Sequence, residues 1–90
     1  MDWQGKEPMK DTTETITTIL ADILLVRREE ILPEVTMASL GADSLDMEEI
    51  LQGVDFEFGI VTPRSIAEES KVGDLIALAD ALLAKKGARL

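Results

Sequence analysis

The chain has 90 residues, 46% hydrophobic and 30% charged, which fits one small globular domain and leaves no length for a second core. It contains no cysteine and no histidine, so disulfides, thiolate nucleophiles, imidazole bases and the commonest zinc ligands are excluded. Eighteen acidic residues against nine basic ones give a net charge of −9 at pH 7, which disfavours nucleic acid or an anionic bilayer and favours a basic protein partner.

The first ten residues show no hydrophobic periodicity, and we expect a flexible leader over 1–10, a folded domain over 11–86 and a tail over 87–90. The longest apolar stretch is interrupted by Asp22 and is too short to cross a bilayer, and the amino terminus lacks the apolar segment of a signal peptide. We therefore expect a cytoplasmic protein. With one Trp, two Phe and no Tyr, the core must be aliphatic, which favours an all-α fold.

The first apolar stripe at helical spacing predicts a helix from about 12 to 26, with Asp11 or Thr12 as N-cap. Residues 27–43 lose this period and contain Pro33 and Gly41, so we expect a long loop between the first two helices. Such a loop in a small domain is either functional or contains a short helical turn. Its candidate apolar anchors are Ile31, Leu32, Val35, Met37 and Leu40.

A second helix is predicted from Ser44 to about Phe58, ended by Gly59. Its expected buried stripe is Met47, Ile50, Leu51, Val54 and Phe58. After Pro63, residues 64–70 leave room for a short third helix, and a clean stripe beginning at Val72 predicts a fourth. The predicted architecture is a four-helix bundle with three longer helices.

Ser44 lies where the long loop meets the second helix, which makes its hydroxyl accessible. Because Asp and Ser are preferred N-caps, Asp43 and Ser44 could simply begin a helix. Catalysis by Ser44 would need a general base, but this histidine-free sequence offers only carboxylates and a few lysines, with no lysine near Ser44. We therefore expect no catalytic residue and no enzyme activity. A serine that receives a group from another enzyme accounts better for this position.

The window from Glu29 to Pro63 contains nine of the eighteen acids and no Lys or Arg. Intrahelical ion pairs cannot explain a face without bases, whereas a docking surface for basic partners can. The acids lack the spacing of a calcium-binding loop, and we expect no metal site.

The run Gly41-Ala42-Asp43-Ser44-Leu45-Asp46, together with Glu57-Phe58-Gly59, Pro63 and Lys71-Val72-Gly73-Asp74-Leu75, resembles the acyl carrier proteins of type II fatty acid or polyketide synthesis. The resemblance covers about residues 12–84. It implies that a phosphopantetheinyl transferase attaches 4′-phosphopantetheine from coenzyme A to Ser44, and that the thiol of this arm carries acyl groups as thioesters. It also implies acyl-loading, ketosynthase or acyltransferase partners with basic docking surfaces, and a monomeric chain.

By the same resemblance, one set of residues faces these partners: Asp43, Leu45, Asp46, Met47, Glu49 and Asp55. A second set lines the pocket for the acyl chain: Leu40, Leu51, Val54 and Ala67. Core packing is the competing interpretation of the second set.

Several positions depart from the family pattern, namely Gln52, Phe56, Val61, Thr62, Arg64 and Ser70. They suggest a specialised carrier for a dedicated pathway. Two alternatives stay open, an aminoacyl or peptidyl carrier with the same fold, and an unmodified acidic adaptor or inhibitor in which Ser44 is only part of a helix cap.

Overall fold

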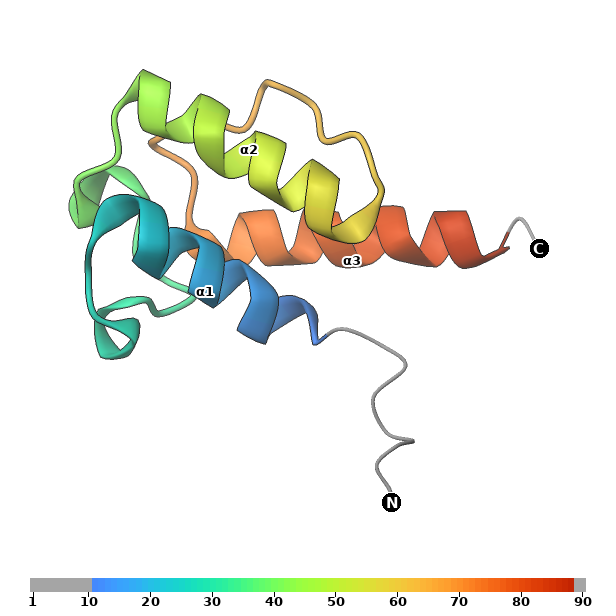
Figure 1. Cartoon of the computed structure of the whole chain (residues 1–90), viewed down its shortest axis with the longest axis horizontal. Coiled ribbons are helices and arrows are strands. Elements are labelled where there is room, and N and C mark those ends of the chain that lie inside the picture. Colours follow the sequence, from blue (N-terminus) through green and yellow to red (C-terminus); the bar gives the residue numbers. More distant parts are fainter. Residues whose placement is uncertain (1–10, 89–90) are drawn as a thin grey trace, which may run out of the picture.

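The computed structural model describes residues 11–88, so the predicted leader and the last two residues of the predicted tail lie outside it. Three α-helices, α1 (Thr12–Leu24), α2 (Ser44–Phe58) and α3 (Val72–Ala88), contact one another in pairs (Figure 1). Within 11–88 the only β-type pairing is an isolated bridge between Thr36 and Lys71. The all-α class is therefore confirmed.

Helix α1 begins at a cap formed by Asp11, whose carboxylate accepts hydrogen bonds from the backbone N–H groups of Thr13 and Glu14. The helix ends at Leu24, two residues earlier than predicted, because Leu25 adopts the left-handed conformation with φ 57°. This turn leaves Leu25 exposed and lets Val26 pack against the core.

Helix α2 has the predicted bounds. Gly59, with φ 66°, ends it by donating its N–H to the carbonyl of Asp55 at 2.8 Å, a conformation that favours glycine. The predicted stripe is confirmed, since the buried residues of α2 are Met47, Ile50, Leu51, Val54 and Phe58. They pack in one core with Ile16 and Leu20 of α1 and with Leu75 of α3.

The connection between α1 and α2 contains two short 3₁₀ helices, Arg28–Glu30 and Ala38–Leu40. Of its predicted anchors, Ile31 and Met37 are buried, and Met37 is completely inaccessible. The backbone N–H of Met37 donates to the carbonyl of Ser70 at 3.0 Å. This connection is thereby fastened to the segment that precedes α3.

The predicted short helix over 64–70 is wrong, and the structure has turns and bends there. Its backbone groups bond elsewhere, because the carbonyls of Glu68 and Ser70 accept from Ala38 and Met37 of the first connection. The Ser70 hydroxyl accepts from the N–H of Ala67. The N–H of Ser70 in turn donates to the carbonyl of Ala67, which closes a single turn. Pairing with another segment has replaced the helix, so the described chain has three α-helices instead of four.

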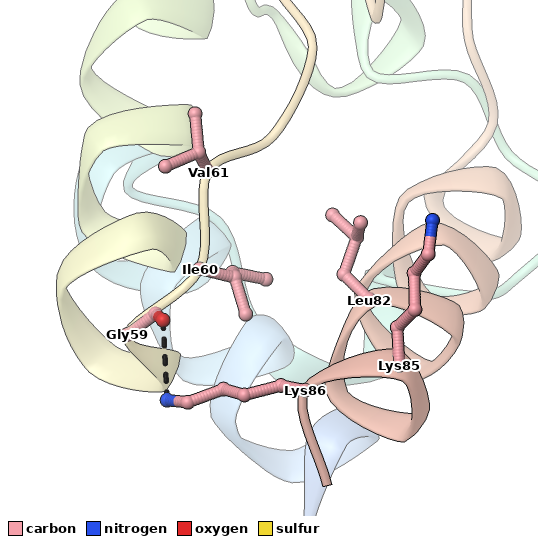
Figure 2. A pocket seen from close by; sticks show the side chains of 6 residues that line it. All are labelled: Gly59, Ile60, Val61, Leu82, Lys85 and Lys86. Carbon is pink, nitrogen blue, oxygen red and sulfur yellow. Dashed lines mark hydrogen bonds between the residues drawn. The ribbon is translucent and has the colours of Figure 1, made fainter. Parts of the chain in front are cut away.

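A hollow of about 370 Å³ lies between the end of α2 and the last turns of α3 (Figure 2). Its lining consists of Gly59, Ile60, Val61, Leu82, Lys85 and Lys86. The ammonium of Lys86 donates to the carbonyls of Phe58 and Gly59, both at 3.1 Å, and so satisfies acceptors at the carboxyl end of α2. Within residues 11–88, no helix has both the length and the apolar character needed to cross a membrane.

Candidate functional site

The backbone before α2 fixes the position of Ser44. Gly41 has φ 98°, a left-handed conformation that a side chain at this position would strain. The next residue, Ala42, is buried and donates its N–H to the carbonyl of Met37 at 3.1 Å. This turn brings the chain out of the core and leaves Asp43 and Ser44 exposed at the start of α2.

Asp43 and Asp46 form a reciprocal capping box at this end of α2. The carboxylate of Asp43 accepts from the N–H of Asp46 at 2.9 Å, and that of Asp46 accepts from the N–H of Asp43 at 3.2 Å. In the described part of the chain, the Ser44 hydroxyl makes no hydrogen bond. The cap is therefore complete without Ser44, which weakens the interpretation of this serine as helix punctuation.

The first backbone N–H groups of α2 are available beside this hydroxyl. As far as the structure describes the chain, the N–H groups of Ser44 and Leu45 donate to no acceptor. Unpaired N–H groups and the positive end of the helix dipole favour an anion at this position. A phosphate ester on Ser44 would fit this environment.

A hollow of about 200 Å³ opens beside Ser44 between α2 and the segment after Pro63. Its lining consists of Ser44, Met47, Glu48, Leu51, Arg64, Ile66, Ala67 and Glu68. Two of the predicted pocket residues, Leu51 and Ala67, meet here from opposite walls. Val54 is instead fully buried in the core, and Leu40 packs against the core away from this lining.

The predicted docking residues divide into exposed and internal ones. Asp43, Leu45 and Glu49 are exposed, and Asp46 is half-buried within the capping box. Met47 was expected beside Leu45 as an apolar anchor, but only 4% of its surface is accessible. Because Met47 belongs to the buried stripe of α2, the structure corrects this placement and leaves Leu45, 79% exposed, as the apolar residue next to Ser44.

Comparison with known proteins identifies the family. Residues 14–79 match the family described as a phosphopantetheine attachment site. An acyl carrier protein of Nitratidesulfovibrio vulgaris is 42% identical over 66 residues, covering 71% of this chain and 87% of that protein. One of Thermosynechococcus vestitus is 41% identical over 59 residues, covering 64% and 73%. The chain belongs to the acyl carrier protein family.

Membership in this family establishes the prosthetic group and the general role. An acyl carrier protein bears 4′-phosphopantetheine and is a carrier instead of a catalyst, and it works with a phosphopantetheinyl transferase and with biosynthetic enzymes. The Ser44 hydroxyl and the N–H groups of Ser44 and Leu45, which have no partner within residues 11–88, fit such a group together with the adjacent hollow.

Asp55 of this carrier, predicted to face partners, is used within the chain. Its carboxylate accepts from the N–H and the hydroxyl of Thr62, at 2.9 and 2.8 Å, and from the guanidinium of Arg64 at 3.2 Å. Burial acts to raise the pKa of Asp55, but the hydrogen bonds from Thr62 and Arg64 and the charge of Arg64 outweigh burial and lower it. We call these three residues the Asp55 clamp, which fastens the segment after α2 to the helix.

Replacing Asp55 by asparagine is expected to lower the free energy of unfolding at pH 7 by about 1–2 kcal/mol, since a neutral amide keeps weaker hydrogen bonds than a carboxylate. Because folding lowers the pKa of Asp55, its contribution is present above the usual value of 3.8 and is lost as the pH falls through the lowered value. The free energies of unfolding of wild type and Asp55→Asn, measured in urea at pH 7 and near pH 3, should differ less at the lower pH.

The matched control for this prediction is Asp80→Asn, which changes an exposed aspartate of α3 outside the clamp. It should change stability little at either pH. A difference between Asp55→Asn and wild type that is independent of pH would contradict the ionic origin of the effect.

Two residues near the site were noted in the sequence as departures from the family pattern, but their positions were not predicted. Arg64 lies directly outside the acidic window, yet it folds back against α2, where its Nε lies 3.9 Å from the Glu48 carboxylate. Phe56, noted as a departure from the family that alters the expected docking face, is 85% exposed. Leu45 and Phe56 are eleven residues apart, close to three helical turns, and this spacing predicts that their side chains lie on the same face of α2.

Proposed function

We propose that Ser44 is the attachment residue for 4′-phosphopantetheine and that the protein presents acyl intermediates, held as thioesters on this arm, to fatty acid, polyketide or related biosynthetic enzymes. The observation that carries the proposal is the exposed Ser44 hydroxyl, free of any described hydrogen bond, at the amino end of α2 beside a hollow. The family match spans this residue.

The residues around Ser44 have separate tasks in this proposal. The N–H groups of Ser44 and Leu45 would receive the phosphate, because the capping box already satisfies the N–H of Asp46. Met47, Leu51, Ile66 and Ala67 provide apolar surface in the hollow for part of the acyl chain. When bound, the group supplies the thiol that this cysteine-free chain lacks.

Docking depends on the outer face of α2. Asp43 and Glu49 would pair with arginines and lysines of the partner around the exposed side chain of Leu45. Helix α2 itself contains no Lys or Arg, so its charges attract a basic surface. We also propose that the substitutions along this face, such as Gln52 and Phe56, adapt the carrier to a dedicated pathway.

The test is the intact mass of the purified protein before and after incubation with coenzyme A and a promiscuous phosphopantetheinyl transferase. A gain of one phosphopantetheine, localised to Ser44 by fragmentation of the peptide that contains it, is the expected result. No gain in a protein that is folded by circular dichroism would overturn the proposal and favour an unmodified acidic adaptor.

A further inference from the structure

The carboxyl end of α2 displays large apolar side chains on its surface. Phe56 is 85% exposed and Val61, directly after the helix, is 83% exposed. A single exposed apolar residue is ordinary, but two of them at the same end of a helix offer apolar surface that a partner can cover. We call Phe56 and Val61 the distal patch.

Phe56 lies on the same stripe of α2 as the apolar residue next to Ser44. Leu45, Glu49, Gln52 and Phe56 follow one another at intervals of four, three and four residues, and all four are exposed. Such spacing places them along one side of a helix. Eleven residues at about 1.5 Å per residue separate Leu45 from Phe56 by roughly 16 Å.

The Asp55 clamp fixes the position of Val61. Asp55 accepts from the N–H of Ile60 through its carbonyl, at 3.2 Å, and from Thr62 through its carboxylate, so both neighbours of Val61 are bonded to α2. Figure 2 shows the side chain of Ile60 pointing across the hollow toward Leu82, whereas Val61 points away from it. Val61 is therefore held outside the core, and both of its neighbours are bonded to Asp55, the residue of α2 directly before Phe56.

The electrostatics of the face change along its length. Near Ser44 the carboxylates of Asp43 and Glu49 are exposed, with no base on the helix. Toward the distal patch, the guanidinium of Arg64 lies beside both Asp55 and Glu48 and offsets their charge. A complementary partner is therefore basic opposite Ser44 and apolar opposite Phe56.

We propose that the distal patch is a second, apolar contact for the enzyme that loads Ser44, which would receive Phe56 in a recess about 16 Å from the contact with Leu45. The inference rests on the proposed function of Ser44. An ordinary interface buries roughly 800 Å² per partner, a patch about 30 Å across, so one partner spans both contacts. A buried aromatic side chain is a typical centre of binding energy in such an interface.

The test is the steady-state kinetics of phosphopantetheine transfer, with coenzyme A saturating and the transferase from the same organism as probe. Phe56→Ala is expected to raise the KM for the carrier about tenfold with little change in kcat, because it removes binding surface away from the reacting serine. Phe56→Glu should raise the KM at least as much. If the partner were basic at this point, Phe56→Glu would lower the KM, and the proposal would be wrong.

The control is Leu25→Ala, which truncates an equally exposed apolar residue at the end of α1 and should leave the KM unchanged. An unchanged KM in both Phe56 variants, with Ser44 still modified, would overturn the distal contact and leave the proposed function intact. Absence of transfer to the wild type would overturn both. A wild-type dimer in sedimentation that Phe56→Ala converts to monomer would assign the patch to a second copy, against the proposal.

Discussion

Replacing Ser44 by alanine is expected to abolish the gain of phosphopantetheine completely and to leave stability almost unchanged. The two outcomes separate because the Ser44 hydroxyl makes no hydrogen bond within residues 11–88, whereas Asp43 and Asp46 form the cap of α2. Removal of a serine that acted as N-cap would cost about 1 kcal/mol. Removal of an exposed serine at the next position should change the free energy of unfolding by less than about 0.5 kcal/mol.

The measurements are intact mass after incubation with coenzyme A and the transferase, and urea unfolding of the unmodified protein. Ser65→Ala is the matched control, since Ser65 is also exposed and lies in the segment after α2. It should be modified like the wild type. Modification of Ser44→Ala would place the attachment elsewhere, and a loss of stability of about 1 kcal/mol would restore the capping role of Ser44.

The start of the site was predictable because its determinants are local. A cap at Asp43 and a glycine at 59 define α2 from nearby sequence alone, and the structure places both ends there. The 3.6-residue period also predicted the buried stripe correctly. Ser44 at the first helical position follows from these two signals.

Met47 illustrates a conflict between two kinds of inference. Its place in the helical stripe predicted burial, whereas the resemblance to the carrier family assigned it to partner docking. The structure follows the period, since Met47 is buried beneath the exposed Leu45. A family role transfers to a residue only where the local helix face allows it.

The remaining differences come from contacts between distant parts of the chain. Residues 64–70 were predicted as a helix, but Glu68 and Ser70 bond to Ala38 and Met37, about thirty residues earlier. The hydrogen bonds of Asp55 were also not predicted, because Thr62 and Arg64 fold back from the next segment to engage it. Periodicity within a window contains no information about such partners.

Met37→Ala is expected to be the most destabilising of the substitutions considered. Met37 is the fully buried anchor of the connection between α1 and α2. Its truncation leaves a cavity in a small core, with a loss of about 2–4 kcal/mol. Since each kcal/mol lost lowers the melting temperature of a domain of this size by about 4–8 °C, the melting temperature should fall by roughly 8–30 °C.

The loss of stability should include the turn before Ser44, because the carbonyl of Met37 accepts a hydrogen bond from the N–H of Ala42, two residues before Ser44. Thermal unfolding of Met37→Ala and of Leu32→Ala provides the comparison, since Leu32 belongs to the same connection but is 45% exposed. Leu32→Ala should cost less than about 1 kcal/mol. Equal losses in the two variants would mean that burial of Met37 does not hold the connection in place. A larger loss for Met37→Ala, with modification of Ser44 retained below its melting temperature, would show that the anchor stabilises the site without taking part in loading.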